Sequence, residues 1–164
     1  MANELTLTIH IAQRTYQPGE DIWLEATLRN NGAATLLVLP FLTLPANDPH
    51  KNTFSVRITD RSGKPITRTS NILTGRMLYV PEPVAILPGG YLQYTAPVAG
   101  TFDGKARWVA GELYDAGNEY TIVTPGSYSV SAVYEITEQH IYAPGAGEIW
   151  RGRASATPVE VVIG

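Results

Sequence analysis

One stretch of this sequence decides the fold: Pro125-Gly126-Ser127-Tyr128-Ser129-Val130-Ser131-Ala132-Val133-Tyr134-Glu135-Ile136. Every second residue from Tyr128 to Ile136 is apolar or aromatic, which is the pattern of a β-strand with one buried face. The preceding Pro-Gly pair is a turn signal, so the strand is expected to begin there.

The same alternation marks further strands on the N-terminal and C-terminal sides of this stretch. It runs over residues 5–11, 22–28, 54–58 and 159–163, and shorter apolar runs lie at 36–39, 84–87 and 91–95. Between them are turn signals rich in Pro, Gly, Asn and Asp, at residues 16–20, 30–32, 60–64 and 87–90. No stretch has a convincing helical periodicity. Short strands separated by turns predict an all-β fold, an immunoglobulin-like antiparallel β-sandwich formed by a single domain over residues 1–164.

The composition is typical of a globular domain that is stabilised by packing. The 164 residues are 44% hydrophobic and only 16% charged, and they include no cysteine. The charged share lies below the ~25% of an average globular protein, whereas a disordered chain would have few apolar residues and many charges. Without cysteine, the sequence excludes disulfides, thiolate chemistry and cysteine-based zinc sites.

The charge balance and the hydropathy pattern exclude two kinds of partner. The net charge is -3, and phosphate binding needs clustered cations, so nucleic acid is not an expected partner. The longest apolar run, residues 36–44, contains Pro40 and is shorter than the ~18 residues of a membrane span. No secretory signal follows Met1. We therefore expect a cytoplasmic protein if Met1 is the native start, and otherwise a mature exported domain with its signal removed.

Four segments occur in an order that resembles a known group of proteins. They are Tyr-x-Pro-Gly-Glu at 16–20, Leu-Arg-Asn-Asn-Gly at 28–32, Val-Arg-Ile-Thr-Asp-Arg-Ser-Gly at 56–63 and Pro-Gly-Ser-Tyr-Ser-Val at 125–130, with Leu-Pro-Gly-Gly at 87–90. Over about residues 16–134 the chain is similar to bacterial immunoglobulin-like sandwiches of the intracellular proteinase inhibitor family. The resemblance implies a non-catalytic sandwich that inhibits a cytoplasmic serine protease. Tyr128 is expected to form a tyrosine corner, its hydroxyl bonded to backbone upstream of the strand.

Motifs that would indicate catalysis or a cofactor are missing from the sequence. His10, His50 and His140 are too far apart in sequence for a spaced zinc motif, and a lone histidine is most often a surface residue. There is no Gly-x-Ser-x-Gly elbow and no phosphate-binding glycine loop. Residues 115–119 resemble part of a calcium loop but lack the full ligand series, so a turn is favoured. The prediction is a protein that is not an enzyme, with no catalytic residues, no metal site and no cofactor.

Candidate binding residues gather in the weakly patterned stretches 97–118 and 138–149 and beside them. Long loops in a compact domain often carry function. Aromatic side chains there could stack on sugars or anchor a protein interface, or they could plug the ends of the sandwich, which is favoured because large aromatics are usually mostly buried. The predicted binding residues are Trp108, Glu112, Tyr114, Asp115, Tyr142 and Trp150.

Charge is unevenly distributed along the chain. From Trp108 to Trp150 there is no Lys or Arg but there are six acidic residues, whereas residues 51–76 carry six basic residues and only Asp60. Three interpretations stay open: an acidic face that meets a basic partner or a cation, neighbouring strands that neutralise each other, and head-to-tail self-association. The expected function is a binding or accessory module that recognises another protein through its long loops, in one version a proteinase inhibitor. The alternative is a carbohydrate-binding or adhesin-type module that uses Trp108 and Tyr114.

Overall fold

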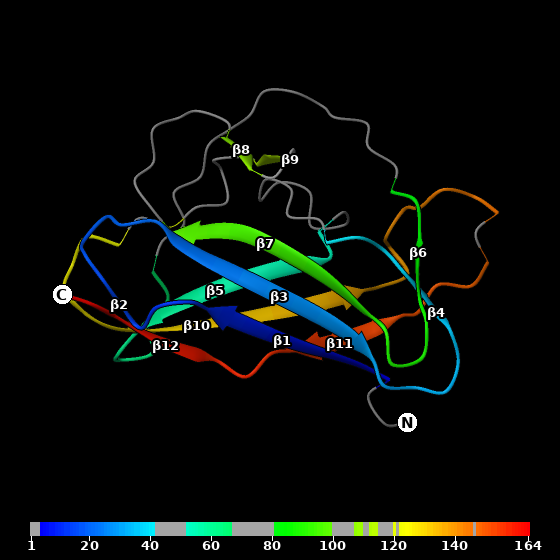
Figure 1. The fold of residues 1–164 in the computed structure, drawn as a ribbon, viewed down its shortest axis with the longest axis horizontal. Coiled ribbons are helices and arrows are strands. Elements are labelled where there is room, and N and C mark those ends of the chain that lie inside the picture. Colours follow the sequence, from blue (N-terminus) through cyan, green and yellow to red (C-terminus); the bar gives the residue numbers. More distant parts are fainter. Residues whose placement is uncertain are drawn as a thin grey trace.

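A computed structural model describes residues 4–41, 52–66, 81–99, 107–109, 112–114, 120, 122–145 and 147–164, with the backbone alone for 96, 107–109 and 112–114. Two β-sheets that face each other form its body (Figure 1). The described residues contain no helix, and therefore none long and apolar enough to cross a membrane. The predicted all-β sandwich is confirmed.

The first sheet has the order β1-β3-β7. β1 (Leu5–Ile11) pairs antiparallel with β3 (Ile22–Asn30), and β7 (Tyr91–Ala99) pairs antiparallel with the other edge of β3. The alternation predicted for the first two strands is confirmed, because Leu5, Leu7 and Ile11 are buried while the threonines between them are exposed. On β3, the side chains of Ile22, Leu24, Ala26 and Leu28 are all buried.

The second sheet is built around β10 (Gly126–Ile136). β5 (Phe54–Asp60) pairs with one edge of β10. The other edge is shared by β12 (Val159–Ile163), opposite the first half of β10, and β11 (Gly152–Ser155), opposite its last residues. The five alternate residues of β10 predicted to point inward are all buried: Tyr128, Val130, Ala132, Tyr134 and Ile136.

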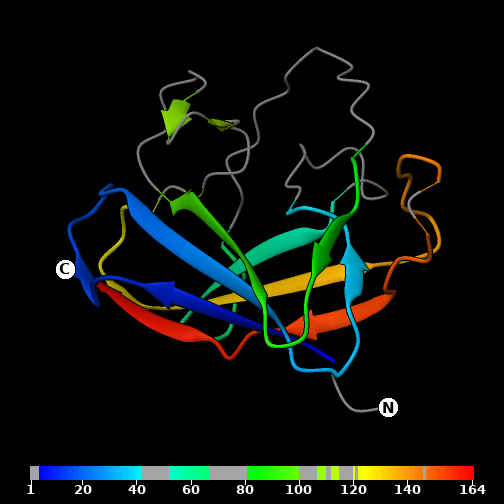
Figure 2. The same cartoon turned by 45° about the vertical axis from the view of Figure 1, so that its right-hand side comes forward.

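The N-terminal segment joins the two layers. After β1, the chain leaves the first sheet, and β2 (Thr15–Tyr16) pairs parallel with β12 of the second sheet. Two smaller antiparallel pairs complete the described fold: β4 (Leu36–Val38) with β6 (Val84–Ile86), and β8 (Arg107–Val109) with β9 (Glu112–Tyr114). Figure 2 shows β4 and β6 beside the ends of β10 and β11.

The turns predicted from Pro, Gly and Asp are confirmed where the structure describes them. Gly19 and Gly89 have φ values of 77° and 75°, and each follows a proline in a turn closed by a backbone hydrogen bond. These are the positive-φ positions at which type II turns require glycine. In the turn after β5, the Ser62 hydroxyl and the Lys64 N–H donate to the Asp60 carboxylate, and together they lower its pKa.

The stretch 97–118, expected as a loop, contains more strand than the sequence indicates. β7 continues to Ala99, and the three-residue strands β8 and β9 lie further along. Strands of three residues are too short for a period-two pattern to distinguish them from a loop. The stretch 138–149 is confirmed as a loop over its described residues.

Tyr128 forms the predicted corner. Its hydroxyl donates to the Thr124 carbonyl oxygen at 2.8 Å, four residues upstream, and its ring is buried at the start of β10. This is the hydrogen bond to upstream backbone that defines a tyrosine corner.

Tyr128→Phe is expected to lower the free energy of unfolding by about 1 kcal/mol, the net contribution of one hydrogen bond. Tyr128→Ala is expected to cost roughly 3–5 kcal/mol, because it also removes a buried ring. Urea unfolding of both variants measures the difference. If both are as stable as the parent chain, Tyr128 contributes neither a corner bond nor core packing.

Candidate functional site

The predicted binding residues fall into two groups that lie apart in the structure. Trp108 belongs to β8, and Glu112 and Tyr114 belong to β9, so these three share one antiparallel pair. Figures 1 and 2 both show this pair away from the 138–145 loop, which contains Tyr142. Asp115 lies outside the described residues. The five predicted residues that the structure describes therefore do not form one continuous site.

Trp150 is half-buried, and it packs on the core at the end of β10. Its ring stacks with that of Tyr134, with centroids 6.2 Å apart and planes at 29°, and its backbone N–H donates to Leu37 O at 2.8 Å. The indole lies so close to Gly152 that a Cβ there would meet ring atom Cζ2 at 2.7 Å. For Trp150, the interpretation as an end plug is thus supported. Tyr142 is likewise half-buried against the core.

The exposed part of the Trp150 region forms a shallow groove, here called the Trp150 groove. It has a volume of about 370 Å³ and lies between the start of β1, β4 and the 148–151 segment. Its lining combines apolar residues (Leu36, Leu37, Ile149 and Trp150, of which Ile149 is itself buried) with polar ones (Glu4, Thr35, Glu148 and Arg151). Sequence reasoning identified Trp150, but it missed the groove because β4 and Trp150 are more than 100 residues apart in sequence.

Asn30 holds together the two turns next to this groove. Its side chain is fully buried: Nδ2 donates to the carbonyl oxygens of Ala34 and Ile86, both at 2.8 Å, and Oδ1 accepts from the Gly32 N–H at 2.9 Å. Its backbone N–H donates to Gly90 O, and its carbonyl oxygen accepts from the Gly89 N–H. All the polar atoms of one residue thus fix the 30–34 turn and the 87–90 turn relative to each other.

Two large apolar side chains flank the turn that Asn30 fixes. Leu87 is 65% exposed and Tyr91 is 61% exposed. Tyr91 begins β7 and lies opposite Arg29 on the outer face of the first sheet. Exposed apolar residues are common, but a pair on a turn with this many backbone constraints is presented in a fixed geometry.

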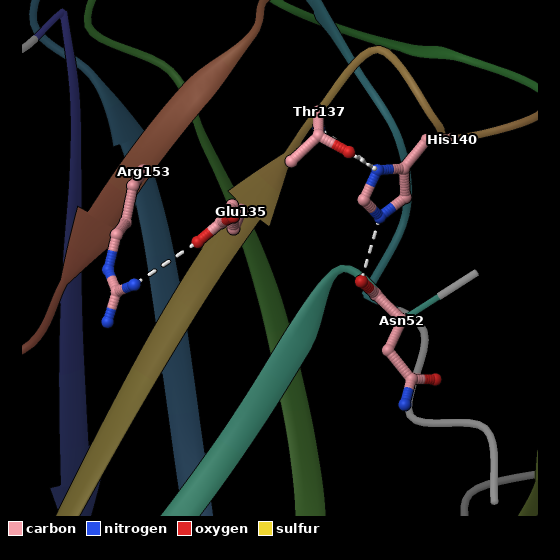
Figure 3. A network of polar contacts seen from close by, with 5 residues as sticks. All are labelled: Asn52, Glu135, Thr137, His140 and Arg153. Atoms are coloured by element: carbon pink, nitrogen blue, oxygen red, sulfur yellow. Dashed lines mark hydrogen bonds and ion pairs between the residues drawn. The ribbon is translucent and has the colours of Figure 1, made fainter. Parts of the chain in front are cut away.

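His140 is buried, so the expectation of a surface histidine is wrong for this residue. Nδ1 accepts from the Thr137 backbone N–H at 3.0 Å, which places the proton on Nε2, and Nε2 donates to Asn52 O at 2.8 Å. Figure 3 shows the contact with Asn52 and also the Thr137 hydroxyl, whose Oγ1 lies 3.1 Å from Nδ1. The ring thus links the end of β10 to the residue two positions before β5. No signal in the sequence distinguishes such a structural histidine from an exposed one.

The acidic stretch is partly neutralised within the molecule. Glu135 on β10 pairs with Arg153 on the neighbouring strand β11, with the Oε2 and Nη1 atoms 3.3 Å apart on the outer face of the second sheet (Figure 3). Both side chains are largely exposed, so the pair contributes little to stability. Glu138 and Glu148 are exposed as well, and none of the ion pairs among the described residues involves them.

Comparison with protein-family models and with curated proteins found no match to this chain. Among the residues that the structure describes, no three His, Asp or Glu side chains gather in a way that could hold a metal ion. The geometry of the end with the Asn30 turns and the Trp150 groove is therefore the main guide to function.

Proposed function

We propose that this chain is a non-catalytic binding module that recognises another protein. The observation that carries the proposal is the pair of exposed apolar side chains, Leu87 and Tyr91, on a turn fixed by Asn30. Contacts that dominate protein interfaces are enriched in tyrosine and cluster where apolar side chains become fully desolvated. A turn held in its bound shape loses little entropy on association, which favours affinity.

The test is affinity capture from the source cell with the immobilised chain and two variants. The double variant Leu87→Ser with Tyr91→Ser is expected to capture at least ten-fold less partner than the parent chain, while its melting temperature stays unchanged. Val123→Ser is the matched control, because Val123 is 62% exposed but lies beside the start of β10. Equal capture by the parent chain and the double variant would contradict the proposal.

An inhibitor is one version of this function, and it is the one that the family resemblance suggests. The expectation is that the chain blocks a cytoplasmic serine protease at a molar ratio of about one and is not cleaved on prolonged incubation, since a tight protein complex of standard interface size dissociates slowly. A protease that stays active, or that digests the chain, argues for a different protein partner.

The second candidate is a carbohydrate-binding module. It is favoured by the outer face of the first sheet, where Trp23 and Tyr91 lie toward opposite ends of a surface with Thr27 and Gln93 between them. Oligosaccharide that stacks on this face should quench tryptophan fluorescence, and Trp23→Phe should remove the quenching. No quenching with a panel of neutral oligosaccharides would reject this candidate.

A further inference from the structure

The Trp150 groove is lined by both apolar side chains and carboxylates. Leu36, Leu37 and Trp150 supply the apolar surface, and Glu4 and Glu148 are exposed at the groove. Arg151 also lines it, so two negative charges stand against one positive charge and the balance is negative. Within the described part of the chain, no ion pair engages either glutamate.

The local backbone brings these groups close together. A Cβ at Gly147, which has φ +91°, would lie 3.3 Å from Leu37 Cδ1, and a Cβ at Gly32 would lie 3.5 Å from Glu4 Cγ. Gly147 therefore allows the 147–151 segment to approach Leu37 closely, whereas the distance at Gly32 is an ordinary van der Waals separation that places the Glu4 side chain beside the 30–34 turn. The position of the Trp150 indole is fixed by its stacking on the Tyr134 ring and by its close approach to Gly152.

We propose that the Trp150 groove binds an arginine or lysine side chain on an extended segment of a partner protein, an inference that rests on the proposed function. Long cationic side chains bury their methylene stems on apolar surface while the charged head stays at a polar rim. A guanidinium or ammonium group over an indole is attracted by the ring, and it forms strong hydrogen bonds with carboxylates. The net negative charge of the groove selects a cation over an anion.

The test uses a random heptapeptide library displayed on phage and selected on the immobilised full chain. Selected peptides are expected to carry Arg or Lys beside an aliphatic residue. The best peptide is then synthesised, and its affinity is measured for the parent chain, for two variants of the groove and for the Leu87→Ser with Tyr91→Ser variant. Glu4→Gln with Glu148→Gln should bind it at least ten-fold more weakly, whereas Arg151→Gln should bind it as tightly or more tightly. Trp150 is left in place, so the melting temperatures should agree.

The variant Leu87→Ser with Tyr91→Ser separates this inference from the proposed function. A peptide that loses affinity for that variant but not for the glutamine double variant overturns the groove proposal and leaves protein recognition standing. The groove proposal is also overturned if the selected peptides lack a cationic residue or if the library yields no binder. The proposed function is tested separately, by the capture of a partner from the source cell.

A second copy of the chain is the competing occupant, because the exposed 60–64 turn carries Arg61 and Lys64. Sedimentation velocity over a range of concentrations decides this. A monomer at all concentrations agrees with the proposal. Self-association that disappears in the Glu4→Gln and Glu148→Gln double variant assigns the groove to a second copy and overturns the proposal.

Discussion

Tyr134→Ala is expected to be among the most destabilising single substitutions in this chain, at roughly 3–5 kcal/mol, as for buried aromatic residues in other cores. Tyr134 is completely buried, and its ring contacts both Phe41 and Trp150. Its hydroxyl donates to the Leu39 carbonyl oxygen, which ties β10 to the end of β4. Tyr134→Phe keeps the ring but leaves that oxygen without its donor, so a loss of about 1–3 kcal/mol is expected.

The same residue should make stability depend on pH in alkaline solution. Burial raises the pKa of the Tyr134 phenol well above the value of about 10 that is usual for tyrosine, because the charged form loses its hydration in the core. As the pH rises, the unfolded chain therefore releases the Tyr134 proton before the folded chain does. The stability that the buried neutral phenol contributes is fully present below about pH 10, and above it the free energy of unfolding falls by up to ~1.4 kcal/mol per pH unit.

Urea unfolding between pH 8 and 11 measures both effects. The difference in stability between the parent chain and Tyr134→Phe should shrink above pH 10, because only the parent carries the buried phenol. Tyr91→Phe is the control, since Tyr91 is exposed and its removal should change neither the stability nor the slope. A parallel pH dependence of the parent chain and Tyr134→Phe would contradict the assignment.

Asn30→Ala is expected to lower the free energy of unfolding by about 2–4 kcal/mol, because each buried polar group without a partner costs roughly 1–3 kcal/mol. The substitution leaves the carbonyl of Ile86 and the N–H of Gly32 without their side-chain partners. Asn30→Asp should cost at least as much despite its similar shape, since a carboxylate oxygen would then face the two carbonyl oxygens to which Nδ2 now donates.

Asn31→Ala provides the matched control for Asn30. Asn31 is exposed, and its side chain donates only to the Thr6 hydroxyl at 2.9 Å, so a change within about 0.5 kcal/mol is expected. Amide hydrogen exchange adds a local measurement: Asn30→Ala should reduce the protection of the Gly89 and Gly90 amides, which the two linked turns hold in place. Equal stability of the two variants would contradict the role given to Asn30.

The strands could be predicted from the sequence, whereas their partners could not. Alternation identified the buried face of β10 because each residue's direction in a strand depends on local geometry alone. The turns at Gly19 and Gly89 were likewise readable, since few residues adopt a positive φ. Pairing is different, because β5 and β10 are brought together by contacts between residues about 70 positions apart.

In the candidate site, too, the features that depend on local sequence could be predicted, and those that depend on distant contacts could not. Trp150 could be singled out because a large aromatic beside a loop is conspicuous, but its stacking on Tyr134 could not be foreseen. Asn30 could be predicted as a turn residue. Its burial could not, because it depends on packing against Ile86, which is 56 positions away in the sequence. His140 gave no signal at all. Exposed and buried polar residues have identical side chains, and only the fold decides which hydrogen bonds they form.

The pairing of β2 with β12 has a consequence for how the chain folds during its synthesis. Thr15 lies beside Val162, so during synthesis β2 has to wait for a strand that lies far downstream of it in the chain. Until then the β10 edge that β12 will cover is open, and open strand edges are templates for association with other chains. The time between the synthesis of β10 and that of β12, rather than the stability of the finished sandwich, then sets how long a nascent chain stays vulnerable to aggregation.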